Sequence, residues 1–285
     1  MSQFEDRFWS SRDGLRLHYR DYPGAADRLP VVCLHGLTRN ARDFANLAGQ
    51  LSGARRVLVP DMRGRGDSAY AKDPESYNTL QYIDDLQVLL AEQGIDRFIA
   101  VGTSMGGLMS MIMAVTMPER IAAAVLNDIG PELSTEGLDK IRDYVGQGRT
   151  FPTWMHAARA LEEEHGPAFP QWQFDDWLAQ AKRVMTLSGN GRIVFDYDMK
   201  IAEPFLQLDF TQQPDLWPAF AALAAKPVLV VRGGISELFA AETCVRMGRS
   251  SDQVECVTVP QVGHAPTLDE PEAVAGIARL LARAA

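Results

Sequence analysis

Residues 102–106, Gly-Thr-Ser-Met-Gly, have the spacing Gly-x-Ser-x-Gly and stand between two apolar segments. Residues 98–101 predict a buried strand and residues 105–117 a buried helix. A sharp strand-to-helix turn of this kind lifts a serine hydroxyl clear of a sheet, and the flanking glycines let strand and helix close on each other. We therefore expect Ser104 to be a nucleophile at such an elbow. The alternative is a glycine-rich turn with an incidental serine.

A serine hydroxyl is a weak nucleophile unless a general base, usually a histidine oriented by a carboxylate, takes its proton. In an open parallel sheet, reactive groups gather at the carboxyl ends of the strands. His264 follows the last predicted strand, residues 254–259. It is also the one histidine after the elbow that lies outside the presumed helical insertion, so we expect it to be the base.

Two carboxylates could orient this histidine. Glu237 follows the predicted strand 227–232, and Asp128 ends the predicted strand 121–126. Both satisfy the chain order serine, acid, histidine. We favour Glu237, because its strand immediately precedes the one that delivers His264. Asp128 stays open as the acid, with a local cap or turn role as its alternative.

Acyl chemistry also needs N–H donors where the oxyanion develops. One should be the backbone N–H of Met105, which opens the helix after Ser104. The other should be that of Leu37, in the loop that begins His35-Gly36. We expect Gly36 to let this loop approach the substrate, and His35 to serve as a hydrogen-bonding residue within it.

A sheet must position these groups. Continuous apolar runs predict buried parallel strands, with helical periodicity between them; the runs are residues 30–34, 56–60, 98–101, 121–126, 227–232 and 254–259. An antiparallel hairpin should precede them, with its turn at Asp13-Gly14. Residues 132–217 instead show amphipathic helices with proline joints and no buried strand. We therefore predict one core, residues 1–131 and 218–285, with a helical cap inserted at 132–217.

The composition excludes several classes of function. A net charge of −9 and a pI near 5.1 argue against a nucleic-acid-binding surface. No apolar run approaches the roughly 18 residues of a membrane span, and the N-terminus lacks signal-peptide features. Three separated cysteines show no metal-site spacing. We expect a cytoplasmic protein without a membrane partner.

Together, five motifs resemble those of cap-bearing α/β-hydrolase-fold enzymes, and they occur in this order: 35–36, 61–68, 102–106, 232–237 and 263–264. The resemblance implies a mostly parallel central sheet with helices on both faces and an inserted helical cap. It also implies that the 61–68 loop is structural, so that Asp61, Arg63 and Asp67 have no catalytic role. Such enzymes usually carry Asp where Glu237 stands, which keeps Asp128 open.

A serine at the elbow sets this chain apart from dehalogenases and epoxide hydrolases of the fold, which need a carboxylate there. The expected function is hydrolysis of a small, largely apolar carboxylic ester or lactone through an acyl-enzyme, with no metal and no cofactor. The alternatives are hydrolysis of a carbon–carbon bond, a ligand receptor without turnover, and a lyase or cofactor-free oxygenase. The expected binding partner is the small-molecule substrate. Whether the protein forms a homodimer is left open by the sequence.

Bulky side chains of the cap could line an apolar substrate pocket. They are Trp154, Met155, Trp172, Phe174, Trp177, Met185, Phe195 and Phe205. We expect Trp154, Trp172 and Trp177 to bind substrate. For each, packing of the cap against the sheet is the alternative.

Overall fold

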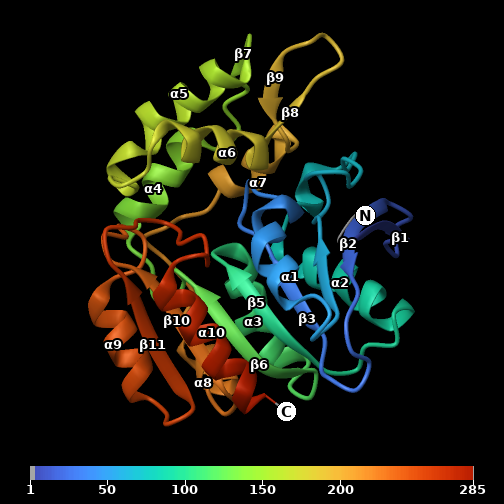
Figure 1. The fold of residues 1–285 in the computed structure, drawn as a ribbon, viewed down its shortest axis with the longest axis vertical. Coiled ribbons are helices and arrows are strands. Elements are labelled where there is room, and N and C mark those ends of the chain that lie inside the picture. Colours follow the sequence, from blue (N-terminus) through green and yellow to red (C-terminus); the bar gives the residue numbers. More distant parts are fainter. Residues whose placement is uncertain (1–3, 285) are drawn as a thin grey trace.

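The fold is built on a twisted sheet, seen in a computed structural model that describes residues 4–284 (Figure 1). The sheet has eight strands in the order β1-β2-β4-β3-β5-β6-β10-β11. Their bounds are β1 (Glu5–Ser10), β2 (Arg16–Tyr22), β3 (Val31–Leu34), β4 (Val57–Pro60), β5 (Phe98–Thr103), β6 (Ile121–Asn127), β10 (Val228–Gly233) and β11 (Val254–Val259). The predicted N-terminal hairpin and the predicted parallel strands are all present.

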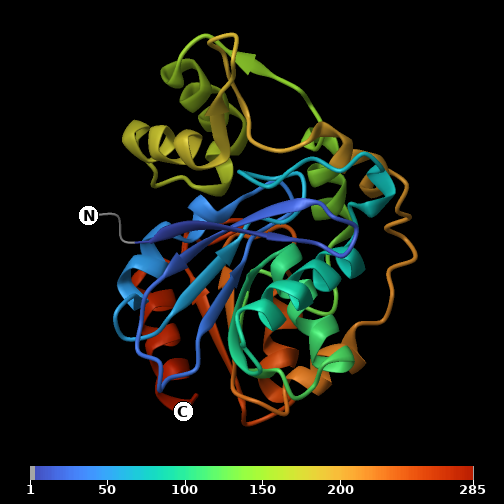
Figure 2. The same cartoon turned by 90° about the vertical axis from the view of Figure 1, so that its right-hand side faces the viewer.

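Helices cover both faces of the sheet, as the continuous apolar strands require (Figure 2). On one face, α1 (Ala45–Leu51) and α10 (Pro271–Arg283) pack over alternate strand residues such as Val31, Ile99 and Leu229. The other face is covered by α2 (Thr79–Glu92), α3 (Met105–Thr116), α8 (Trp217–Leu223) and α9 (Ala241–Arg249). The α/β hydrolase architecture expected from the sequence is confirmed.

The chain between β6 and β10 leaves the sheet and forms most of the upper lobe in Figure 1. We refer to residues 132–217 as the cap segment. Its helices are α4 (Thr135–Tyr144), α5 (Trp154–His165), α6 (Phe174–Val184) and α7 (Ala202–Leu206). It also contains a small antiparallel sheet that the sequence analysis did not expect, of strands β7 (Thr150–Phe151), β8 (Met185–Leu187) and β9 (Ile193–Phe195). These strands of two or three residues are too short to give a periodic signal.

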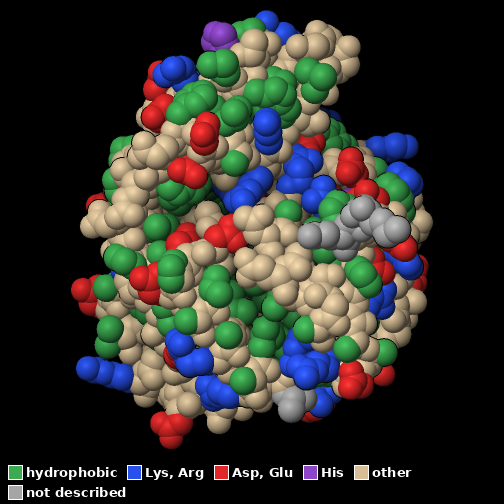
Figure 3. All heavy atoms as spheres, in the orientation of Figure 1, with side chains coloured by type: hydrophobic (Ala, Val, Ile, Leu, Met, Phe, Trp, Pro, Cys, Tyr) green, Lys and Arg blue, Asp and Glu red, His purple; other side chains and the backbone are tan. Residues whose placement is uncertain are grey.

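Polar contacts join the cap segment to the core along one seam. Arg42 pairs with Asp196 at 2.5 Å and also donates to the carbonyl of Arg183. In the space-filling view, basic and acidic side chains gather where the upper lobe meets the body (Figure 3). Between residues 4 and 284, no helix combines the length and the apolar character needed to cross a bilayer.

Candidate active site

Ser104 occupies a strained turn between β5 and α3. Its φ is +51° and its ψ is −113°, in the left-handed half of conformational space that non-glycine residues rarely adopt. The glycines on either side permit the turn. A Cβ on Gly102 would lie 2.3 Å from the carbonyl carbon of Gly106, and one on Gly106 would lie 2.0 Å from the carbonyl oxygen of Leu34. The expected elbow geometry is present.

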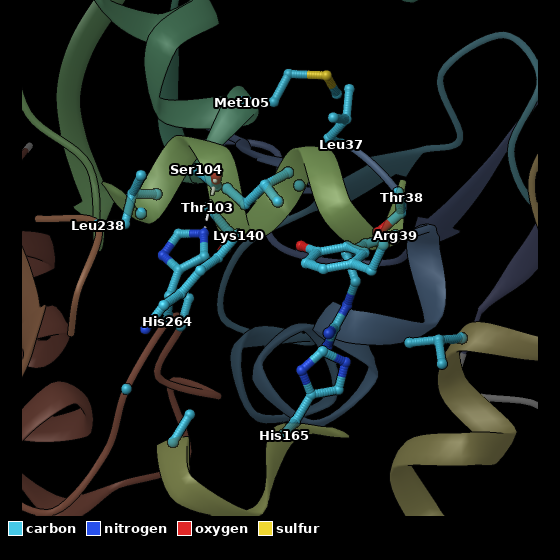
Figure 4. A pocket seen from close by; sticks show the side chains of 18 of the residues that line it. Leu37, Thr38, Arg39, Thr103, Ser104, Met105, Lys140, His165, Leu238 and His264 are labelled. Atoms are coloured by element: carbon cyan, nitrogen blue, oxygen red, sulfur yellow. Dashed lines mark hydrogen bonds between the residues drawn. The ribbon is translucent and has the colours of Figure 1, made fainter. Parts of the chain in front are cut away.

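Ser104, His264 and Asp128 form a continuous hydrogen-bonded series. The Nε2 atom of His264 lies 3.1 Å from the Oγ atom of Ser104, and its Nδ1 atom lies 2.7 Å from an Oδ atom of Asp128. Each residue follows the carboxyl end of a different strand: β5, β6 or β11. Figure 4 shows the ring of His264 turned toward Ser104, with a dashed line marking their hydrogen bond.

The Asp128 carboxylate is buried and accepts hydrogen bonds from three groups. Besides facing His264, it accepts from the backbone N–H of Gly233 at 2.8 Å and from the hydroxyl of Ser236 at 2.6 Å. These hydrogen bonds replace the water contacts that the carboxylate loses on burial. Asp128 also has a positive φ of +53°, which turns its side chain toward the loop after β10.

Glu237 does not lie beside His264, contrary to our preference from the sequence. Its side chain is 66% exposed and pairs with Lys140 of α4. The carboxylate next to His264 is that of Asp128, which the sequence had left as the alternative acid. The loop after β10 does reach this site, but through Ser236, the residue before Glu237.

The loop after β3 brings the backbone of Leu37 to the cavity beside that of Met105. Neither N–H has a hydrogen-bond partner among residues 4–284, so both are available to an oxygen in the cavity. Figure 4 shows the Leu37 and Met105 side chains next to each other. The predicted role of these two groups as oxyanion donors stays a prediction.

Arg65, which sequence reasoning missed, holds this loop in place. Its side chain is fully buried and donates to the carbonyl oxygen of Leu37 at 2.9 Å, and an Nη atom lies 3.9 Å from the Met105 sulfur. It also donates to the hydroxyl of Tyr82 at 2.9 Å. Its place in the arginine- and glycine-rich segment 61–68 was the available signal.

His35 makes structural hydrogen bonds, one within its own loop as expected and one to the segment after β4. Its Nε2 atom accepts from the backbone N–H of Met62 at 3.0 Å, while Nδ1 lies 2.7 Å from the carbonyl oxygen of Gly36. Burial lowers the pKa of His35 to about 4, so the ring is neutral near pH 7. Asp61, Arg63 and Asp67 do not line the cavity.

A cavity of about 1140 Å³ lies between the cap segment and the carboxyl edge of the sheet. Ser104 and His264 lie on its wall, as do two of the predicted cap residues, Trp172 and Trp177. Trp154 does not line it: this side chain packs into the apolar cluster of the cap segment instead. Its predicted contact with substrate is therefore not supported by the geometry.

Among residues 4–284, one group of side chains has ligand atoms close enough for a metal ion. Atoms of His18, Asp61 and Asp67 lie within 4.8 Å of one another. However, both ring nitrogens of His18 already face carboxylates, Asp61 at 2.7 Å and Asp6 at 2.9 Å. These contacts describe a cluster of paired polar side chains at the β1–β2 hairpin better than a metal site.

The sequence matches the α/β hydrolase fold family over residues 30–271. The chain belongs to this family. A crystal structure of an α/β hydrolase from Novosphingobium aromaticivorans superposes on this α/β hydrolase with a TM-score of 0.96 and 59% identity, covering 99% of each chain. A putative hydrolase from Rickettsia typhi superposes with a TM-score of 0.87 and 25% identity over 100% of each chain.

Two curated relatives of this α/β hydrolase are hydrolases by name. It is 33% identical to a 3-hydroxybutyrate-oligomer hydrolase of Cupriavidus necator, covering 91% of this chain and 90% of the relative. It is 28% identical to a 2-(acetamidomethylene)succinate hydrolase of Mesorhizobium japonicum, covering 85% of this chain and 84% of that one.

Proposed function

We propose that this α/β hydrolase is a serine hydrolase that cleaves carboxylic esters through an acyl-enzyme on Ser104. The observation that carries the proposal is the continuous contact from Ser104 through His264 to the buried carboxylate of Asp128. This is the arrangement that makes a serine hydroxyl nucleophilic at neutral pH.

In the acylation step, the Oγ atom of Ser104 attacks the ester carbonyl while Nε2 of His264 takes the hydroxyl proton. Asp128 holds the ring through Nδ1 and stabilises its charged form. The oxygen that gains negative charge is bound by the backbone N–H groups of Leu37 and Met105. His264 then protonates the departing alcohol, leaving Ser104 acylated.

In the deacylation step, water replaces the alcohol. His264 takes a proton from that water, whose oxygen attacks the acyl carbonyl, and then returns the proton to the oxygen of Ser104. The products are a carboxylic acid and the free enzyme. We assign binding of the acyl group to the cap segment and the sheet edge, because residues of both line the cavity.

Two observations support an ester as substrate. The name of the Cupriavidus necator relative denotes hydrolysis of a hydroxyacid oligomer, whose units are joined by ester bonds. The cavity also has an apolar wall that suits an acyl chain, including Ile129, Leu133, Leu138, Ile141 and Leu238.

The test is hydrolysis of a series of p-nitrophenyl esters with acyl chains of two to eight carbons, alongside a lactone and a carbon–carbon cleavage substrate. We expect the wild type to cleave the esters and the Ser104→Ala variant to lose this activity by at least roughly 10³-fold. Equal rates in the two proteins, or cleavage of the carbon–carbon substrate alone, would contradict the proposal.

A further inference from the structure

Three polar side chains gather on the cavity wall at a distance from His264. They are Arg39, Tyr144 and His165, from the loop after β3, the end of α4 and the end of α5. The rings of Tyr144 and His165 meet edge to face, with centroids 5.6 Å apart. Figure 4 shows Arg39 and His165 on the opposite side of the view from Ser104 and His264.

Arg39 is held in a fixed position by partners in the core and the cap segment. It donates from Nε and Nη2 to the two carboxylate oxygens of Asp43, at 2.6 and 2.9 Å. With its amide oxygen turned toward Arg39, Gln180 of α6 accepts from both Nη atoms at 2.7 and 2.6 Å. Because a guanidinium has five N–H donors, one on Nη1 is left without a partner among the described residues.

Tyr144 and His165 also have polar atoms that are free to bind a ligand. The Tyr144 hydroxyl makes no hydrogen bond within residues 4–284, and His165 Nε2 lies 3.9 Å from the nearest Glu164 oxygen, beyond hydrogen-bond range. Burial raises the pKa of Tyr144 to about 12, so its hydroxyl keeps its proton. Burial lowers the pKa of His165, which favours the neutral ring.

The charge of this cluster selects its ligand. Asp43 neutralises Arg39 through two hydrogen bonds, and Glu164 beside His165 is paired with Arg149 at 2.8 Å. The other two groups of the cluster are an uncharged phenol and an imidazole whose neutral form is favoured. An anion bound there would lie near the Asp43 carboxylate, which repels it. An uncharged oxygen acceptor would instead satisfy the free donors without that repulsion.

One end of this cluster, the stem of Arg39, begins near Ser104. A Cβ placed on Gly36 would lie 3.3 Å from Cγ of Arg39 and 3.8 Å from Cβ of Ser104, so the stem of Arg39 begins beside the nucleophile. Its guanidinium extends away from Ser104 toward His165 (Figure 4). An acyl chain on Ser104 that follows the stem of Arg39 along the cavity wall leads toward the cluster.

We infer that Arg39, Tyr144 and His165 form a specificity subsite for an uncharged oxygen, a ketone, hydroxyl or second ester carbonyl, on the acyl chain of the substrate. This inference rests on the proposed ester hydrolysis and narrows it. The preferred substrate is an oxygen-bearing acyl ester, such as an oligoester, rather than a simple alkanoate or an acid half-ester.

The test compares three p-nitrophenyl esters of similar length: the hexanoate, the 5-oxohexanoate and the glutarate monoester. We expect the wild type to show the highest kcat/KM with the 5-oxohexanoate. Tyr144→Phe should lower that value roughly three- to tenfold, the effect of one hydrogen bond, and change the hexanoate value less than about twofold. Tyr70→Phe is the matched control, because Tyr70 is 52% exposed and lies outside the cavity.

Three results would overturn the subsite. These are a wild-type preference for the hexanoate, a preference for the glutarate monoester, and an equal fall for all three esters in Tyr144→Phe. If the wild type cleaves none of the three, the proposed ester hydrolysis itself fails and the subsite fails with it. If the hexanoate is cleaved without a gain from the added oxygen, only the subsite fails.

Discussion

At the scale of single residues, the environment of Asp128 distinguishes it from every other carboxylate considered. It is buried, it faces His264 at 2.7 Å, and the remaining hydrogen bonds to its oxygens come from Gly233 and Ser236. These donors fix the direction of the carboxylate. Glu237, exposed and paired with Lys140, has neither property.

Replacing each acid by its amide tests this distinction. Asp128→Asn should lower kcat for p-nitrophenyl esters by about 10³- to 10⁴-fold, because an amide neither orients the same tautomer of His264 nor stabilises its charged form. Glu237→Gln should change kcat less than roughly twofold. Steady-state kinetics of both variants, with unfolding curves to confirm the fold, make the comparison, and the reverse ranking would refute the assignment of Asp128.

The sequence predicted Ser104 and His264 at this site because each stands directly after an apolar strand with a recognisable spacing. It could not decide the acid, because Asp128 and Glu237 both follow strands and satisfy the same chain order. The deciding facts are the positive φ of Asp128 and the arrival of Ser236 at its carboxylate. Both depend on loop conformations that no periodic pattern encodes.

At the scale of elements, the loop after β3 depends on buried polar contacts from the segment after β4. Arg65 contacts both residues whose N–H groups face the cavity, through the carbonyl oxygen of Leu37 and the sulfur of Met105. We regard Arg65 as a positioning residue. Strand positions were predictable from apolar runs, whereas this contact between two loops was not.

Arg65→Lys should therefore disturb the loop. Lysine cannot reproduce the fork that reaches Leu37, Arg63 and Tyr82 together. We expect kcat to fall at least about tenfold with a smaller change in KM, since oxyanion contacts act mainly in the transition state. The exposed Arg97 provides the control, Arg97→Lys. A change in KM alone would contradict this role.

The same loop should make stability depend on pH through His35. Its pKa is about 4 in the folded protein because of burial and about 6.5 when unfolded. As the pH falls below 6.5, the unfolded chain binds a proton that the folded one resists, so stability present above pH 6.5 is lost toward pH 4. The loss should be on the order of 3 kcal/mol.

Urea unfolding of wild type and His35→Gln between pH 4 and 7.5 measures this effect. The variant should be less stable at pH 7.5 but show a shallower decline with acid. Parallel curves for the two proteins would show that His35 does not titrate as its burial requires.

At the scale of the whole molecule, the site lies where two parts of the chain meet. The sheet supplies Ser104, His264 and Asp128 from its carboxyl edge, and the cap segment lies above that edge (Figure 1). Residues of both parts line the cavity. The helical insertion was predictable from the break in strand rhythm after residue 131. Which aromatic residues line the cavity was not: Trp154 begins α5 and Trp172 lies in the loop before α6, and no periodic pattern shows that Trp172, rather than Trp154, lines the cavity.

The central claim is that Ser104 forms a covalent acyl intermediate. The most direct measurement is intact-mass and peptide analysis after incubation with a fluorophosphonate, which reacts with activated serines. The account predicts one adduct per chain, mapped to Ser104, absent in Ser104→Ala and much slower to form in His264→Ala. An unmodified wild-type protein, or an adduct that persists in Ser104→Ala, would contradict it.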